Sequence, residues 1–190
     1  AGLGTVGTGV VKIVQRHADL LERRAGRKIV ISAVSARSRT KNRDVDLSGY
    51  AWEDDPVALA NRDDVDLFVE VMGGSDGPAR TSTEAAIAAG KDVVTANKAL
   101  LAHHGQVLAE AAEAKGHVIR FEAAVAGGIP VVKALTEGLA GNEIRRVMGV
   151  MNGTCNYILT RMENAGLPYE TVFEEARQLG YLEADPTLDV

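Results

Sequence analysis

Apolar, β-branched runs alternate with helix-like segments along most of the chain, and this alternation constrains the fold more than any other feature. Strands are expected at residues 29–36, 66–74, 92–97 and 117–125, and helices between them near 55–62, 81–90 and 104–116. The first run, 29-IVISAVSA-36, is apolar enough to be buried on both faces, as strands of an open parallel sheet are. A strand, helix, strand repeat of this kind predicts an α/β fold built on a doubly wound parallel sheet with right-handed crossovers.

The chain opens on a glycine loop, 1-AGLGTVGTGV-10, which leads into a segment with helical periodicity. Gly2, Gly4 and Gly7 match G-x-G-x-x-G, in which the first glycine permits a tight turn, the second lets the backbone approach a pyrophosphate, and the third lets the helix pack closely on a strand. The amides of Thr5 and Val6 open the helix and would donate to the phosphates. A glycine-rich structural turn is the alternative, but the alternation downstream favours a Rossmann-type NAD(P)-binding domain over residues 1–125.

A basic run follows the first expected strand and contains four cations, Arg37, Arg39, Lys41 and Arg43. An Asp or Glu at this point usually bonds the ribose hydroxyls of NAD, whereas Arg or Lys favours the 2′-phosphate of NADP. We therefore predict NADP(H) over NAD(H), with Arg37 and Lys41 at the adenosine end of the cofactor. A solvated basic loop is the alternative.

Lys98 lies between an expected strand and a helix start, in the segment 93-VVTANKALLA-102. Ligands of open α/β sheets bind outside the carboxyl ends of the strands, and 71-VMGG-74 is a second such end. An amine there would point toward the nicotinamide half of the cofactor, where it can polarise a carbonyl, stabilise negative charge on its oxygen or take part in proton transfer. This suits reduction of an aldehyde or ketone. A lysine that snorkels from a helix N-terminus to solvent is the alternative on spacing alone.

The alternation of strand and helix signals changes near residue 126. A helix is expected at 127–141, a strand at 144–154, and two further helices at 155–166 and 168–180. Residues 126–190 are therefore predicted to begin a second, α+β domain. Because the chain starts inside the glycine loop and ends at Asp189-Val190 in mid-pattern, we expect it to be an incomplete piece of a longer protein.

Composition excludes several classes of function. The chain of 190 residues is 46% hydrophobic and 25% charged, as an ordinary globular protein is. No apolar run approaches the roughly 18 to 20 residues of a membrane-spanning helix, and no secretory signal pattern is present, so a cytoplasmic location is expected. The net charge of −5 and the absence of basic residues interleaved with aromatics argue against nucleic acid as a partner. Cys155 is the only cysteine and can form no intrachain disulfide, and no Cys/His spacing resembles a zinc site.

Five segments, in order, resemble homoserine dehydrogenase over essentially the whole chain: GLGTVG, VTANKALLA, FEAAVAGGIPVVKAL, GVMNGTCNYILTRM and GYLEADPTLDV. That family reduces aspartate β-semialdehyde to L-homoserine with NADPH or NADH, on the path to threonine, methionine and isoleucine. Its members have a Rossmann domain followed by a substrate and dimerisation domain, which implies a homodimer formed through the second domain. The resemblance also implies that a further aspartate and a second active-site lysine lie beyond Asp189, so independent activity is not expected of the chain as written.

The resemblance assigns roles to residues of the nucleotide domain. It places the cofactor phosphates on Gly2 to Gly7, the adenosine end at Arg37, and the nicotinamide ribose at Gly73 and Gly74. Lys98 becomes one of the family's two active-site lysines.

The resemblance further implies a cation site and part of a substrate site. The cation would be a monovalent ion such as sodium, held by oxygen ligands in 122-EAAVAGGI-129. Its ligands would be Glu122 and the backbone carbonyls of Val125, Gly127 and Ile129; composition alone indicates only a strand-to-helix turn there. The substrate would meet Tyr181, Glu183, Gly153 and Thr154, with Asp189 a weaker candidate. Glu183 is suited to pair with the substrate ammonium group, although 183-EADPTLD-189 alone reads as an acidic surface turn.

Three functions fit these observations. An NADP-dependent homoserine dehydrogenase accounts for every motif. A different Rossmann aldehyde reductase or dehydrogenase is the second, although an acylating enzyme would need a catalytic cysteine and Cys155 has no histidine base beside it in sequence. A non-catalytic nucleotide-binding sensor is the third; it needs only the glycine loop and the basic run, and leaves Lys98 unexplained.

Overall fold

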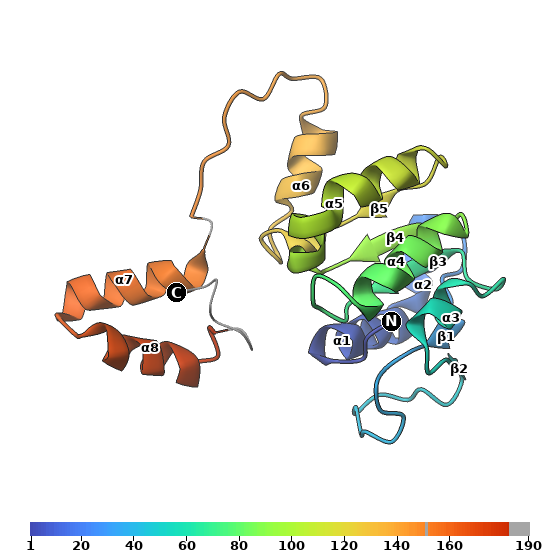
Figure 1. Ribbon diagram of the computed structural model, residues 1–190, viewed down its shortest axis with the longest axis horizontal. Helices are drawn as coiled ribbons and strands as arrows, with labels where there is room; N and C mark the ends of the chain where they lie inside the picture. Colours follow the sequence, from blue (N-terminus) through green and yellow to red (C-terminus); the bar gives the residue numbers. More distant parts are fainter. Residues whose placement is uncertain (151, 183–190) are drawn as a thin grey trace. The chain divides into compact units, whose positions relative to one another are not determined.

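The computed structural model describes residues 1–150 and 152–182, and the chain divides into two compact units, Ala1–Ala140 and Gly141–Val190 (Figure 1). The first unit contains all the strands that the structure assigns, whereas the described part of the second contains a pair of helices. The domain boundary predicted at residue 125 stays a prediction.

The first unit alternates strands and helices, as the sequence predicts. Its elements in chain order are α1 (Thr5–Arg16), α2 (Ala18–Ala25), β1 (Ala33–Val34), β2 (Ala51–Trp52), α3 (Pro56–Ala60), β3 (Leu67–Glu70), α4 (Pro78–Ala88), β4 (Asp92–Thr95), α5 (Lys98–Glu113), β5 (Ile119–Arg120), the 3₁₀ turn η1 (Glu122–Ala124), α6 (Val131–Lys133) and the π turn η2 (Ala134–Gly138). Strands β1 and β2 pair in parallel, and β3, β4 and β5 form a parallel sheet in that order. The predicted α/β class with parallel sheets is confirmed.

The first two residues of the chain lie between the two sheets and bond to both. The amide of Gly2 donates to the carbonyl of Ser35 at 2.8 Å, just beyond β1. On the other side, the amine of Ala1 donates to the carbonyl of Val69 at 2.6 Å, and the amide of Val71 donates to the carbonyl of Ala1 at 2.9 Å. The glycine loop therefore begins in the middle of the strand order, next to the end of β3.

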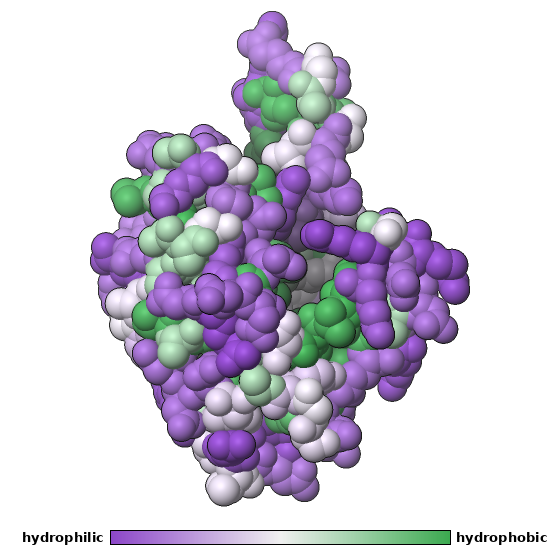
Figure 2. Space-filling model, turned by 90° about the vertical axis from the view of Figure 1, so that its right-hand side faces the viewer, coloured by the Kyte–Doolittle hydropathy of each residue, from purple (hydrophilic) through white to green (hydrophobic). Residues whose placement is uncertain are grey.

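Side-chain alternation in β3 and β4 sets the main core of this unit. Phe68 and Val93 are 1% and 0% exposed, and they pack with residues of the flanking helices. Helices α4 and α5 lie along one side of the β3–β4–β5 sheet (Figure 1). They contribute Ala86, Ile87, Leu100, Leu108 and Ala112 to this core. Hydrophilic residues cover most of the surface seen in Figure 2, with small apolar patches between them.

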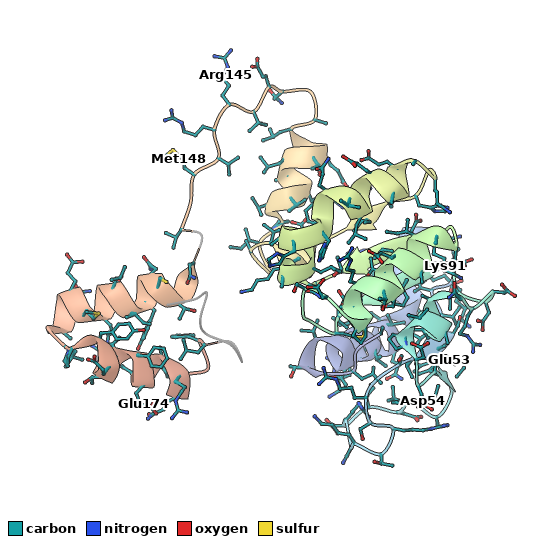
Figure 3. All side chains as sticks on the ribbon, viewed as in Figure 1. Glu53, Asp54, Lys91, Arg145, Met148 and Glu174 are labelled. Carbon is teal, nitrogen blue, oxygen red and sulfur yellow. The ribbon has the colours of Figure 1, made fainter. Side chains whose placement is uncertain are left out.

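Three predicted strands differ from the structure. The run 117–125 is a strand only over Ile119–Arg120 and continues into the 3₁₀ turn Glu122–Ala124. The run 29–36 pairs only from Ser32 onward and is a strand only over Ala33–Val34, and Val30 is 69% exposed, so its predicted burial on both faces is wrong. Its partner β2 is only two residues long and offers no backbone groups to residues 29–31. The strand expected at 144–154 is also wrong for the described residues, because 144–150 pair with no described strand. The labelled side chains of Arg145 and Met148 project from this segment (Figure 3).

The second unit confirms both predicted helices. Helix α7 (Gly153–Ala165) begins after Asn152, whose side chain accepts from the amide of Cys155, and it ends at Gly166 with φ of 63°. Helix α8 (Tyr169–Gln178) is followed by Gly180 with φ of 76°. Positive φ favours glycine, which explains why both helices stop there. Ile158, Val172 and Ala176 form the buried contact between the helices.

Within the described residues, no helix combines the length and apolar character needed to cross a membrane.

Candidate active site

The three glycines of the loop have different surroundings. Gly2 has φ of +93°, and a Cβ there would lie 2.6 Å from the carbonyl oxygen of Val71. A Cβ on Gly7 would lie 1.9 Å from the carbonyl oxygen of Gly2. Gly4 is exposed, and a Cβ there would meet nothing within 4 Å. The first and third glycines are therefore required by the chain itself, whereas the space beside the second is open to a ligand.

Helix α1 presents its N-terminus at this open position. Gly4 is its N-cap and has no side chain, so the first amides of the helix receive no side-chain cap. Thr5 and Val6 are exposed there. Amides in the first turn of a helix have no acceptor within the helix, and together with the helix dipole they favour an anion.

The four cations of the basic run do not share one role. Arg37, Arg39 and Lys41 are exposed. Arg43 is half-buried, and its guanidinium donates to the carbonyls of Leu3 at 3.1 Å, Lys41 at 2.8 Å and Ser38 at 2.5 Å. Arg43 thus fixes the basic run to the glycine loop, whereas Arg37, Arg39 and Lys41 stay exposed.

Trp52 in β2 contacts two cations of the basic run. The guanidinium carbons of Arg39 and Arg43 lie 5.8 and 5.6 Å from the centroid of its ring. Contacts of this length are cation–π interactions. Two of the four cations are therefore held against Trp52, whereas Arg37 and Lys41 are exposed.

The carboxyl ends of β3 and β4 bring the diglycine turn and Lys98 together. Gly73 and Gly74 follow β3, are exposed, and have φ of 84° and 87°. Asn97 follows β4; its side-chain amide donates to the carbonyl of Gly74 at 2.7 Å, and its side-chain oxygen accepts from the amide of Leu100 at 3.0 Å. Lys98 is exposed and is the first residue of α5. One asparagine thus joins the turn to the start of the helix that carries Lys98.

Sequence reasoning missed a buried polar group behind this turn. Glu70 is 0% exposed, and it accepts hydrogen bonds from the amide of Met72 at 2.7 Å and the hydroxyl of Thr95 at 2.6 Å. A carboxylate inside the apolar run 66-DLFVEVMGG-74 is the signal that could have found it, because position 70 shares the buried face of Phe68.

Asp76 fixes the other side of the diglycine turn. Its carboxylate accepts from the hydroxyl of Ser75 at 2.9 Å and contacts Nε2 of His104 in α5 at 3.0 Å. The hydrogen bond from Ser75, followed by that from His104, lowers the pKa of Asp76 below its usual value. The turn is therefore tied to α5 at two places, by Asn97 and by Asp76.

The predicted cation ligands lie in one short turn. The carboxylate of Glu122 accepts from the amides of Val132 at 3.1 Å and Lys133 at 2.9 Å, and so caps α6. The carbonyl of Ile129 accepts from the amide of Val131 at 2.8 Å. Val125 and Gly127 lie between Glu122 and Ile129 in the same turn. Each carboxylate and carbonyl oxygen keeps a second lone pair, so this all-oxygen set fits a hard cation.

The second unit brings together three of the residues predicted to meet the substrate. The hydroxyl of Thr154 donates to the carbonyl of Tyr181 at 2.9 Å. Gly153, Thr154 and Tyr181 line a hollow of about 660 Å³. The remaining lining residues are Asn156, Tyr157, Thr160, Arg161, Asn164 and Gly180. Glu183 and Asp189, the other predicted substrate contacts, lie outside the described residues.

Two of the residues that line this hollow, Tyr157 and Tyr181, have aromatic rings in contact. The rings of Tyr157 and Tyr181 are 4.9 Å apart at an interplanar angle of 63°, an edge-on arrangement typical of stable aromatic pairs. Burial, and then a hydrogen bond to Glu175, raises the pKa of Tyr157. The phenol hydroxyl is therefore already engaged by Glu175.

Comparison with known families agrees with this geometry. Residues 2–122 match the profile of the homoserine dehydrogenase NAD binding domain, and residues 130–190 match the homoserine dehydrogenase profile. Homoserine dehydrogenase of Neisseria gonorrhoeae is 47% identical over 189 residues, which are 100% of this chain and 43% of that protein. The Bacillus subtilis enzyme is 44% identical, again over 100% of this chain and 43% of its own length. The chain thus spans less than half the length of these curated relatives.

Solved structures give the same result. A homoserine dehydrogenase from Thiobacillus denitrificans matches with a TM-score of 0.90 and 45% identity, covering 100% of this chain and 43% of that one. A hyperthermophilic archaeal homoserine dehydrogenase in complex with NADPH matches with a TM-score of 0.83 and 26% identity, covering 100% of this chain and 62% of that one. The profiles, the identities and the shared fold agree, and the chain belongs to the homoserine dehydrogenase family of oxidoreductases.

Proposed function

We propose that this chain provides the cofactor site and part of the substrate site of a homoserine dehydrogenase. The reaction is the reversible, NADPH-dependent reduction of L-aspartate 4-semialdehyde to L-homoserine, a step toward threonine, methionine and isoleucine. The observation that carries the proposal is the junction of the diglycine turn with the start of α5, where Lys98 stands at the carboxyl ends of β3 and β4.

The residues of the glycine loop and the diglycine turn would hold the dinucleotide. The open space at Gly4 and the amides of Thr5 and Val6 suit its pyrophosphate, with Gly2 and Gly7 shaping the turn. Gly73 and Gly74 are exposed at the end of β3, where the nicotinamide ribose would lie. When bound, the cofactor supplies the hydride that adds to the aldehyde carbon.

The preference for NADP(H) is supported by the three exposed cations. Arg37, Arg39 and Lys41 follow β1, and the described structure gives Arg37 and Lys41 no acidic side-chain partner. A 2′-phosphate dianion would pair with them. The structure of the archaeal relative in complex with NADPH supports this choice of coenzyme.

Lys98 would act on the carbonyl oxygen of the aldehyde. As the ammonium ion it donates a hydrogen bond to that oxygen and stabilises the negative charge that develops there during reduction. Tyr181, Thr154 and Gly153 would contact the rest of the substrate, and Glu183 would pair with its ammonium group.

Glu122 and the carbonyls of Val125, Gly127 and Ile129 would bind a monovalent cation such as sodium. Because the same carboxylate caps α6, the cation would stabilise the turn that follows β5. Thermal stability in sodium, compared with a bulky organic cation at equal ionic strength, tests this site without any assay of activity.

We also propose that residues 1–125 form the nucleotide domain and residues 126–190 begin the substrate domain. That second domain would form a homodimer of a cytoplasmic enzyme. The separate profile matches to residues 2–122 and 130–190 support the division into two domains.

The deciding experiment is oxidation of NADPH by the full-length protein with aspartate semialdehyde. We expect turnover with this substrate, none with simple aldehydes that lack the α-amino acid group, and slower turnover with NADH. A folded protein that binds NADPH and does not oxidise it with the semialdehyde would contradict the substrate assignment and favour the nucleotide sensor.

A further inference from the structure

A carboxylate lies on the buried face of β3. Glu70 is 0% exposed and lies on the same face of the sheet as Phe68, with Val93 and Thr95 beside them in β4. Helices α4 and α5 cover this face. An ionised carboxylate in such a place is strongly unfavourable unless hydrogen bonds or opposite charges compensate for the lost water.

Hydrogen bonds from the backbone and side chains of the candidate site compensate Glu70 for its lost water. One oxygen of Glu70, Oε1, accepts from the amides of Met72 at 2.7 Å and Gly73 at 3.3 Å. The other, Oε2, accepts from the hydroxyl of Thr95 at 2.6 Å. Glu70 and Thr95 are direct partners in the parallel register, so this side-chain bond follows from strand pairing.

Thr95 passes the constraint on to the start of α5. Its hydroxyl oxygen accepts from the amide of Asn97 at 3.0 Å. Asn97 in turn bonds the carbonyl of Gly74 and caps the amide of Leu100. Hydrogen bonds thus link Glu70 to the diglycine turn directly, and to the start of α5 through Thr95 and Asn97.

The diglycine turn needs such a support. Gly73 and Gly74 both have strongly positive φ, and glycine has the greatest backbone freedom of any residue. Without a fixed acceptor for its amides this turn would sample several conformations, and the site would lose its alignment.

We propose that Glu70 is a positioning residue of the reductase site: it fixes the diglycine turn directly, and the start of α5 through Thr95 and Asn97. The proposal rests on the proposed function, since it assigns Glu70 a role in aligning that reaction. Glu70 does not touch the substrate and is not a catalytic residue.

A matched pair of substitutions at Thr95 tests the proposal in the full-length protein. Thr95→Val keeps the shape and removes the hydroxyl, whereas Thr95→Ser keeps the hydroxyl. We expect Thr95→Val and Glu70→Gln to lower kcat about 10- to 100-fold, as loss of supporting hydrogen bonds does at other sites. Thr95→Ser should retain kcat within about threefold. Rates are expressed per site that binds NADPH, so that unfolded protein does not enter the comparison.

A merely structural role would give a different result. It would lower the Tm and the number of binding sites and leave kcat per binding site unchanged, and that result would overturn the proposal. Glu22→Gln is the control, because Glu22 is an exposed residue of α2 that has no ion pair among the bonds described. It should keep wild-type kcat and KM.

Amide hydrogen exchange gives a second readout that needs no turnover. We expect the amides of Met72 and Gly73 to exchange more rapidly in Glu70→Ala than in the wild type, while amides within β4 keep their protection. Unchanged exchange at these two amides would refute the positioning role. If the wild type shows no turnover with the semialdehyde, the proposed function fails, and exchange still decides whether Glu70 holds the turn.

Discussion

The two ends of β4 each carry a lysine, and the structure uses the two lysines differently. Lys91 precedes the strand, is 7% exposed, and donates to the backbone carbonyls of Arg62 and Val65 (Figure 3). Lys98 follows the strand and is exposed at the N-terminus of α5. At the amino end of β4, Lys91 is buried and bonds backbone carbonyls of the chain. At the carboxyl end, the buried Asn97 bonds the exposed diglycine turn, and the next residue, Lys98, is exposed. The position of a lysine relative to the strand direction therefore says more about its role than its charge does.

Replacing each lysine by methionine tests this contrast most strongly. We expect Lys98→Met to lower kcat about 1,000-fold, because the developing charge on the substrate oxygen loses its donor, with NADPH binding kept. Lys91→Met should keep kcat per binding site and lower the free energy of unfolding by about 2 kcal/mol, because two buried carbonyls lose a charged donor. Steady-state kinetics and denaturant unfolding measure the two effects. Equal loss of kcat in both variants would break the comparison.

Substitutions in the glycine loop, next to the carboxyl end of β3, give the next largest effects. Gly7→Ala should lower the free energy of unfolding by more than about 3 kcal/mol, because its Cβ would overlap the carbonyl of Gly2. Gly4→Ala should leave stability within about 1 kcal/mol and weaken NADPH binding, because only the ligand would meet the new methyl group. Thermal unfolding and fluorescence titration with NADPH separate these outcomes. Equal destabilisation by both changes would contradict the assignment of the open space to a ligand.

The basic run offers a smaller, coenzyme-specific effect. Arg37→Ala should raise KM for NADPH about tenfold, the value of one charge-assisted hydrogen bond, and leave KM for NADH unchanged. Arg43→Ala should affect both coenzymes alike and reduce stability, because Arg43 bonds three backbone carbonyls. Parallel assays with the two coenzymes give the answer. If Arg37→Ala weakened NADH equally, the preference for NADP(H) would not come from this residue.

The smallest effect is expected at the amino end and concerns acid stability. Asp92 accepts from the amide of Val118 at 3.1 Å and pairs with Nδ1 of His117 at 3.1 Å; the first of these contacts, then the second, lowers its pKa. A carboxyl whose pKa is lower in the folded state stabilises the fold at pH values above its unfolded pKa of about 4. This contribution is lost as the pH falls through the folded pKa. Asp92→Asn should therefore reduce the drop in Tm on acidification, with Asp63→Asn, an exposed aspartate, as the control. An unchanged acid profile would show that Asp92 contributes nothing.

Local sequence signals predicted the fold class and the glycine loop but not the lengths of the strands. Alternation of apolar runs and helix signals is a local property, and the parallel α/β arrangement followed from it. Strand length depends on the partner, which is why 29–36 is mostly unpaired and 144–150 is not a strand in the described structure. An apolar, β-branched run favours extension and supplies no partner for its amides.

The predicted site shows the same limit. Lys98 and the diglycine turn follow strands in the sequence, so their shared edge could be predicted. The role of Glu70 could not, because it depends on register with Thr95, 25 residues away. Whether the substrate contacts predicted in the second unit act on one molecule with Lys98 stays a prediction.

The unequal surroundings of the three glycines also bear on how the sequence can drift over evolutionary time. Gly2 and Gly7 are held by the chain itself, so any descendant that keeps the fold must keep them, whatever it binds. No atom of the chain stands within 4 Å of where a Cβ on Gly4 would lie, so the described structure does not itself require glycine there. A descendant that stopped using a dinucleotide would therefore be free to change residue 4 while Gly2 and Gly7 stay fixed.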